Sequence, residues 1–110
     1  MSEQFLMAVD AGTGSVRAVL FRTDGTQIGC VQQEWEHRAD PRYPGSMDFY
    51  WTHNWRLACG CIRGVIEETG VRPEQIAAVS TTCMREGIVL YDRDGQEIWA
   101  CANVDARSDD

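Results

Sequence analysis

The chain has 110 residues, of which 44% are apolar and 25% are charged, a balance typical of one globular domain. The formal net charge is −7, and all ten lysine-or-arginine positions are arginines that form no cluster. Because nucleic acids and anionic membranes are bound by clustered positive charge, neither partner is expected. The sequence has neither a roughly 20-residue apolar span nor the pattern of a secretory signal, so we expect a cytoplasmic protein.

The five cysteines favour structural thiols over a disulfide framework or a zinc site, because their number is odd and no CxxC pair occurs. Cys59 and Cys61 stand two positions apart within a helical pattern, so their side chains are predicted to point to different faces. We therefore interpret the cysteines as buried and reduced.

The first third of the chain has the pattern of three antiparallel strands. Residues 5–9 form an apolar run, residues 11–15 supply a turn with two glycines, and residues 16–21 are rich in β-branched side chains. A second turn signal at 23–26 leads into a third predicted strand over 27–35. Three residues of this strand are predicted to face inward: Ile28, Cys30 and Val31.

A loop and an amphipathic helix are predicted next. Residues 37–48 contain two prolines and a glycine and are predicted as a loop. Over 54–69 apolar residues recur at helical spacing, with Thr52 or Asn54 as the N-terminal cap and Gly70 at the end. The predicted buried face consists of Trp55, Ala58, Cys59, Ile62, Val65 and Ile66.

Three further strands are predicted over 76–80, 87–91 and 98–104, and Asp94-Gly95 is a strong hairpin signal between the last two. Three antiparallel strands, a crossover helix and a returning strand describe an α/β domain of the ribonuclease H-like (actin-like ATPase) type, with a mixed five-stranded sheet. Because such crossovers are right-handed, the strand starting at Ile76 should lie beside the one starting at Phe5.

This adjacency predicts a ligand site, because it brings Asp10 and residues 84–86 together at the carboxyl ends of neighbouring strands. The segment Asp10-Ala11-Gly12-Thr13-Gly14-Ser15 offers backbone amides, two hydroxyls and a carboxylate, which suit nucleotide phosphates and a magnesium ion. The two glycines are equally well explained by a tight turn alone. A Walker loop is excluded because the chain has no lysine, and a dinucleotide fingerprint would need glycine at Arg17.

Other polar residues are candidates with structural alternatives. Arg85 and Glu86 suit the hydroxyls of a sugar-like ligand, although a surface pair explains them as well. Asp105 and Arg107 are either site residues or a salt-bridged strand end. The two histidines, His37 and His53, have no partner pattern and are interpreted as structural, and the four tryptophans as core or cleft-lining.

Three segments of the chain resemble the opening part of the FGGY carbohydrate kinases. They are the segment from Met7 to Ala18, the Pro44-Gly45-Ser46-Met47-Asp48 loop, and the stretch from Met84 to Arg107. The resemblance covers essentially the whole chain. It implies that residues 1–110 are the N-terminal actin-like ATPase domain of such an enzyme, with the second domain outside the chain.

The resemblance also implies roles for individual residues. Asp10 would hold Mg²⁺ through water, and the ATP phosphates would meet Gly12, Thr13, Gly14 and Ser15, with Arg17 assisting. The substrate would meet Met84, Arg85, Glu86, Asn103 and Asp105. The family's general base is an aspartate from a later segment, so these residues by themselves are not expected to catalyse phosphoryl transfer.

The substrate implied is a small polyol or sugar-like molecule. Glycerol kinases and many pentulose kinases carry tryptophan where this chain has Asn103, which argues against glycerol or a simple pentulose as the substrate. The stretch from Met84 to Arg107 is most similar to the branch of the family that phosphorylates 4,5-dihydroxy-2,3-pentanedione (autoinducer-2), a quorum-sensing signal. Another sugar kinase activity of the xylulokinase type, a non-catalytic ligand-binding module and a purely structural domain remain open alternatives, as does the oligomeric state, a homodimer included.

Overall fold

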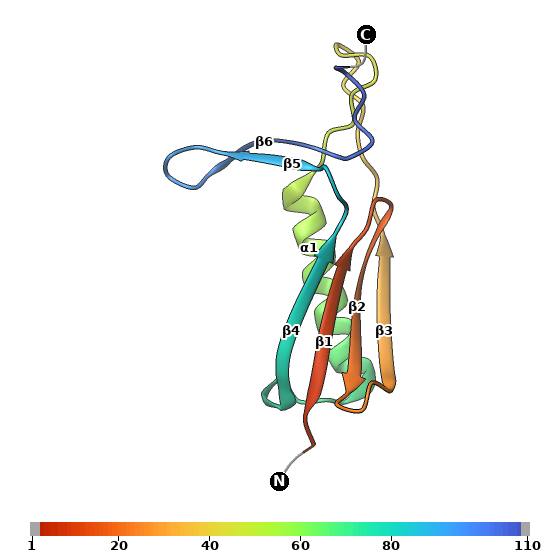
Figure 1. Cartoon of the computed structure of the whole chain (residues 1–110). Helices are drawn as coiled ribbons and strands as arrows, with labels where there is room; N and C mark the ends of the chain where they lie inside the picture. The colour runs from red at the N-terminus through yellow and green to blue at the C-terminus, as the bar shows by residue number, and fades with distance from the viewer. Residues whose placement is uncertain (1–2, 109–110) are drawn as a thin grey trace.

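The computed structural model describes residues 3–108 as a four-stranded sheet, a long helix and a separate hairpin (Figure 1). The sheet has the order β3-β2-β1-β4. The elements in chain order are β1 (Phe5–Ala11), β2 (Ser15–Arg22), β3 (Gln27–Glu34), α1 (Trp51–Thr69), the short 3-10 helix η1 (Pro73–Gln75), β4 (Ile76–Cys83), β5 (Ile88–Tyr91) and β6 (Glu97–Cys101).

The prediction that the first and fourth strands are neighbours in the sheet is confirmed. β1 pairs antiparallel with β2 and parallel with β4, and in this register Asp10 lies opposite Thr82 and Ala11 opposite Cys83. The Met84 amide donates to the Ala11 carbonyl at 2.8 Å, which extends the pairing one residue past β4. The carboxyl ends of β1 and β4 therefore meet at the same edge of the sheet.

The mixed sheet with one crossover helix agrees with the predicted fold class, but within residues 3–108 the sheet has four strands, and the expectation of five is corrected. β5 pairs only with β6, and this hairpin projects sideways from the end of the sheet (Figure 1). The chain leaves the sheet after Met84, and the left-handed φ of 69° at Glu86 is incompatible with a continuing strand.

The core lies between the sheet and α1, which covers one face (Figure 1). Alternate residues of β2, Val16, Ala18 and Leu20, are all fully buried, as the two-residue period of a strand requires. The remaining buried members of this cluster are Phe5, Met7, Trp35, Cys61, Val65 and Val71.

Helix α1 is present as predicted but begins earlier, and four of the six residues predicted to face the sheet lie in or against the core cluster: Ala58, Ile62, Val65 and Ile66. It starts at Trp51, with Tyr50 at the N-cap position and no side-chain cap, so the predicted caps Thr52 and Asn54 lie inside the helix. The buried helix residues are Asn54, Cys61 and Val65, whereas Trp55 is 69% exposed. Within the described part of the chain, no helix has both the length and the apolarity that crossing a membrane requires.

Small residues explain how closely α1 approaches β3. A Cβ atom added to Gly29 would lie 2.5 Å from Thr69 Cγ2, and one added to Gly64 would lie 3.3 Å from Val31 Cγ1. Gly29 and Val31 thus face the helix, so Cys30 between them points away and is exposed, contrary to the prediction. Of the cysteines, all five are free thiols, but only Cys61 and Cys101 are buried.

Candidate functional site

The turn between β1 and β2 forms a compact loop at the carboxyl end of β1. The Gly12 amide donates to the Ser15 carbonyl at 2.8 Å, which closes the turn, while Thr13 and Gly14 are exposed at its tip. Among the residues that the structure describes, the Thr13 and Gly14 amides donate to no protein acceptor. Two consecutive unpaired amides suit an anion such as a phosphate.

The loop is fixed from one side by two aromatic residues that follow β3. The Trp35 indole Nε1 donates to the carbonyls of Gly12 and Thr13 at 3.1 and 3.2 Å. His37 Nε2 also lies 2.5 Å from the Thr13 carbonyl oxygen. His37 was interpreted as structural because no local pattern in the sequence links positions 13 and 37, so its contact with the loop could not be predicted.

Asp10 stands at the end of β1 beside Arg17 on β2. The two are register partners, and Arg17 Nε lies 3.6 Å from Asp10 Oδ2. Their side chains are 46% and 41% exposed, respectively, so solvent screens the pair and it contributes little to stability. The Asp10 carboxylate therefore remains accessible to a ligand or a hydrated cation.

Residues 84–86 lie at the same sheet edge as the loop. Met84 is half-buried against the core, while Arg85 and Glu86 are exposed. Glu86 is the one non-glycine residue with positive φ among residues 3–108, a conformation that costs an ordinary residue about 1 kcal/mol or more. A strained residue held at a sheet edge is a common feature of functional sites.

Asn103, just beyond β6, contacts the turn between β1 and β2 directly. Its Nδ2 donates to Thr13 Oγ1 at 3.2 Å, across 90 positions of sequence. The structure thus brings together three of the predicted groups: the loop, the residues after β4, and the residue after β6.

Asp105 forms a salt-bridged connection between two loops, one of the two predicted alternatives. Its carboxylate accepts from Arg107 Nε and Nη2, the latter at 2.7 Å, and from the Met47 amide at 2.5 Å. Arg107 also binds the carboxylate of Asp48. The Arg107 hydrogen bonds hold the pKa of Asp105 at about 2, and the same contacts raise the pKa of Arg107.

This connection fixes the segment that carries Asn103. The Asp105 side chain is only 8% exposed, and both of its oxygens are occupied by Arg107 or Met47. Two backbone hydrogen bonds join the same loops, from Ala102 N to Met47 O at 2.8 Å and from Ala106 N to Gly45 O at 2.7 Å. Asp105 therefore acts within this structure as a support for the chain around Asn103.

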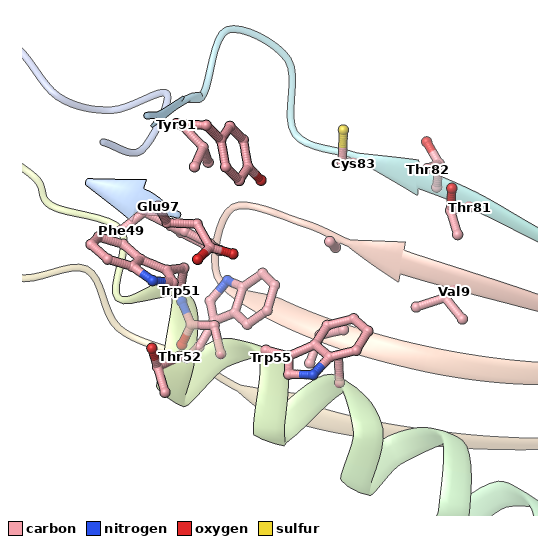
Figure 2. Close-up of a pocket in the computed structure, with 16 residues that line it drawn as sticks. Val9, Phe49, Trp51, Thr52, Trp55, Thr81, Thr82, Cys83, Tyr91 and Glu97 are labelled. Atoms are coloured by element: carbon pink, nitrogen blue, oxygen red, sulfur yellow. The ribbon is translucent and has the colours of Figure 1, made fainter. Parts of the chain in front are cut away.

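An apolar cleft of about 530 Å³ lies between α1, the ends of β1 and β4, and the β5–β6 hairpin. Figure 2 shows Trp51, Thr52 and Trp55 on the α1 side and Thr81, Thr82 and Cys83 along β4. Asn54 also lines it, 1% exposed and without a hydrogen-bond partner for its amide. Of the predicted loop segment only Ala11 lines this cleft, but the cleft adjoins the loop, because Trp35, which donates to the loop carbonyls, lines it as well.

The chain is similar to known proteins over nearly its whole length. Residues 5–108 match the model of the FGGY family of carbohydrate kinases, N-terminal domain. The autoinducer-2 kinase of Escherichia coli (strain SMS-3-5 / SECEC) is 59% identical over 107 residues, which are 97% of this chain and 20% of that protein. The chain thus spans about one fifth of the length of the curated relatives it matches.

Solved structures share the fold. A xyloylose kinase from Brucella ovis superposes with a TM-score of 0.86 at 18% identity, covering 96% of this chain and 22% of that one. The xylulose kinase from Rhodospirillum rubrum superposes with a TM-score of 0.81 at 20% identity, covering 93% of this chain and 21% of that one. Both similarities identify the architecture of the sheet and its crossover helix.

Proposed function

This chain belongs to the FGGY family of carbohydrate kinases, and from that premise we propose that it supplies the phosphate loop and part of the acceptor site of an ATP-dependent kinase. The reaction is transfer of the ATP γ-phosphoryl group to a hydroxyl of a small carbohydrate-like substrate. The observation that carries the proposal is the pairing of β1 with β4, which places the loop and the Arg85-Glu86 pair at one sheet edge. An enzyme that uses ATP in this way is expected to work in the cytoplasm, where ATP is supplied.

In the proposed site, the loop binds the phosphates. The free amides of Thr13 and Gly14 donate to phosphate oxygens, and the hydroxyls of Thr13 and Ser15 add to this set. Arg17 contributes positive charge from the adjacent strand. Phosphoryl transfer is accelerated mainly by positioning and by charge stabilisation, and both are served by donors held in place before the substrate arrives.

Asp10 fits a magnesium ion bound through water. No group of three or more His, Cys, Asp or Glu side chains forms a metal cage within residues 3–108. A single accessible carboxylate beside a phosphate site is nevertheless what Mg²⁺ commonly uses, because it keeps several waters and takes other ligands from the phosphates. The ion would neutralise charge on the nucleotide, and Asp10 would fix its position.

The acceptor hydroxyls are assigned to Arg85, Glu86 and Asn103, with Met84 lining the site and Asp105 supporting it. A guanidinium donates and a carboxylate accepts, so together they orient a polyol. We propose 4,5-dihydroxy-2,3-pentanedione as the substrate, supported by the 59% identity to an autoinducer-2 kinase. The general base and the adenine pocket are expected outside these residues.

The test is a chimera in which this chain replaces the matching segment of the Escherichia coli autoinducer-2 kinase. ADP release is measured with 4,5-dihydroxy-2,3-pentanedione, with xylulose and without acceptor. We expect release with the first substrate. Release only with xylulose would refute the substrate assignment and leave the kinase activity standing, whereas ATP binding without transfer to any acceptor would indicate a ligand-binding module.

Two substitutions in the chimera test the assigned residues. Asp10→Asn should lower kcat strongly, because it removes the charge that holds the magnesium ion. Arg85→Gln should raise KM for the acceptor about tenfold or more, the effect of losing a charged hydrogen bond. The matched control is Arg93→Gln, since Arg93 is also an exposed arginine and lies in the β5–β6 turn, away from the loop. An Arg85 variant that matches this control would contradict the acceptor site.

A further inference from the structure

We propose that Trp35 and His37 are positioning residues that aim the phosphate-binding amides of the loop, an inference that rests on the proposed kinase function. Both residues follow β3, whose carboxyl end lies beside the turn between β1 and β2 (Figure 1). Neither side chain needs to touch ATP to act in this way. Their effect is on the orientation of the peptide groups that do.

Three consecutive carbonyl groups of the loop are bound from the Trp35 side. The Trp35 indole N–H is shared between the Gly12 and Thr13 carbonyls, and the Trp35 backbone N–H donates to the Gly14 carbonyl at 3.1 Å. His37 provides a second donor to the Thr13 carbonyl. Together these contacts leave little freedom for the peptide planes to rotate.

The orientation of the amides follows from the planarity of the peptide group. In a trans peptide the C=O of one residue and the N–H of the next point in opposite directions. Because the Gly12 and Thr13 carbonyls point toward Trp35, the N–H groups of Thr13 and Gly14 must point away from it. These are the two loop amides that have no protein acceptor within residues 3–108.

The two donors are themselves held firmly. Trp35 is 7% exposed, belongs to the core cluster, and packs edge-on against Phe49 with ring centroids 5.5 Å apart. The His37 ring lies 6.0 Å from the same phenyl ring. Since a carbonyl only accepts, His37 Nε2 carries the proton of this bond, while its Nδ1 is buried and has no hydrogen-bond partner among residues 3–108.

Without these contacts a peptide plane of the loop is free to flip. A flip of the Gly12–Thr13 or Thr13–Gly14 peptide would turn a carbonyl oxygen toward the phosphates, where two negative groups repel each other. Fixing the planes in advance therefore removes both a reorganisation step and a repulsive alternative, which is the benefit of preorganised donors. This effect concerns ATP first, because Arg85 and Glu86 lie on a different segment and Asn103 contacts the loop through the Thr13 side chain and not through a peptide group.

The first experiment measures kinetics in the chimera described above. Trp35→Phe keeps an aromatic ring in the core and removes the indole N–H, and it should lower kcat/KM for ATP about tenfold while KM for the acceptor changes less than about twofold. His37→Leu should act in the same direction, and His37→Gln, which restores an N–H donor, should recover most of the loss. The matched control is His53→Leu, since His53 stacks on Tyr50 and lines a pocket beside Gly14, but among residues 3–108 it makes no hydrogen bond to the loop carbonyls. Equal losses for ATP and acceptor, or no recovery with glutamine, would overturn the proposal.

The second experiment is independent of any activity and uses the 110-residue chain itself. In ¹⁵N-resolved NMR the Trp35 indole N–H should exchange slowly with solvent, and Trp35→Phe should shift the Thr13 and Gly14 amide signals while those of the β5–β6 turn stay in place. A rapidly exchanging indole or unmoved loop signals would refute the positioning role. An inactive parent chimera with these NMR results intact would instead refute the proposed function and keep the loop geometry.

Discussion

The contact between Gly45 and Ala106 can be tested by adding one methyl group. Gly45 has a φ of 81°, and a Cβ placed there would lie 2.9 Å from the carbonyl oxygen of Ala106 and 3.0 Å from its carbonyl carbon. Both atoms belong to the backbone, so no side-chain rotation relieves the overlap. The loop must move, and the hydrogen bond of 2.7 Å from Ala106 N to Gly45 O weakens with it.

The cost of Gly45→Ala has two parts. A left-handed φ costs alanine about 1 kcal/mol relative to glycine. Relieving the overlap and weakening one hydrogen bond add about 2 kcal/mol, so the total loss of unfolding free energy is about 3 kcal/mol.

Gly95 provides a control with nearly the same backbone conformation and no neighbour. Its φ is 79°, and a Cβ there would have nothing within 4 Å. Gly95→Ala should therefore cost only the conformational part, about 1 kcal/mol. Urea unfolding of the purified chain, followed by tryptophan fluorescence, measures both variants. Equal losses for Gly45→Ala and Gly95→Ala would show that the loops around Gly45 and Ala106 do not meet, and that they do not hold the segment of Asn103 in place.

Three further predictions concern acidity, packing and strain. Arg107 holds the pKa of Asp105 at about 2, below the usual value of about 3.9, so the ionised form of Asp105 stabilises the fold above about pH 4 and this contribution is lost as the pH falls toward 2. Asp105→Asn should therefore make the unfolding free energy fall less steeply between about pH 4 and pH 2. An unchanged pH dependence in urea titrations of this variant would count against the ion pair. Gly29→Ala should lower the unfolding free energy by about 2 kcal/mol, because the added Cβ would meet Thr69 of α1. Gly60→Ala, in open space on α1 itself, should raise the unfolding free energy by about 0.5–1 kcal/mol. Calorimetry that ranks the two variants the other way would refute the contact between α1 and β3. Glu86→Gly should raise the unfolding free energy by about 1 kcal/mol, because glycine adopts the left-handed φ without strain. The same variant should raise KM for the acceptor in the chimera. A stabilised variant with unchanged KM would show that Glu86 does not bind the acceptor.

The strands and the fold class could be predicted because their signals are local. Alternation of apolar residues in β2 and the turn residues at 11–15 and 92–95 depend only on near neighbours in the sequence. Because crossovers between parallel strands are nearly always right-handed, β4 was then predicted to pair with β1. The meeting of Asp10 with residues 84–86 follows from that rule without any side-chain detail.

Most of the buried face of α1 was predicted from its periodicity, since Ala58, Ile62, Val65 and Ile66 lie in or against the core cluster. The misses are at the margins of this face, because periodicity gives the spacing of buried residues but not how far along the helix the contact extends. Trp55 fits the apolar spacing but stands near the N-terminal end of α1, where it lines the open apolar cleft and is 69% exposed. The sheet was expected to have five strands because β5 has a strand pattern, but a pattern does not tell which partner a strand pairs with.

By itself, the sequence determined the order of elements, the glycine loop after β1 and the family resemblance, since each of these is written in contiguous residues. Only the tertiary structure decided that Trp35 and His37 bind the loop carbonyls, that Asn103 reaches Thr13, and that Asp105 is occupied by Arg107 and Met47. The reason is physical: these contacts join residues far apart in the sequence, and whether such groups meet depends on how the sheet, the helix and the two loops pack together.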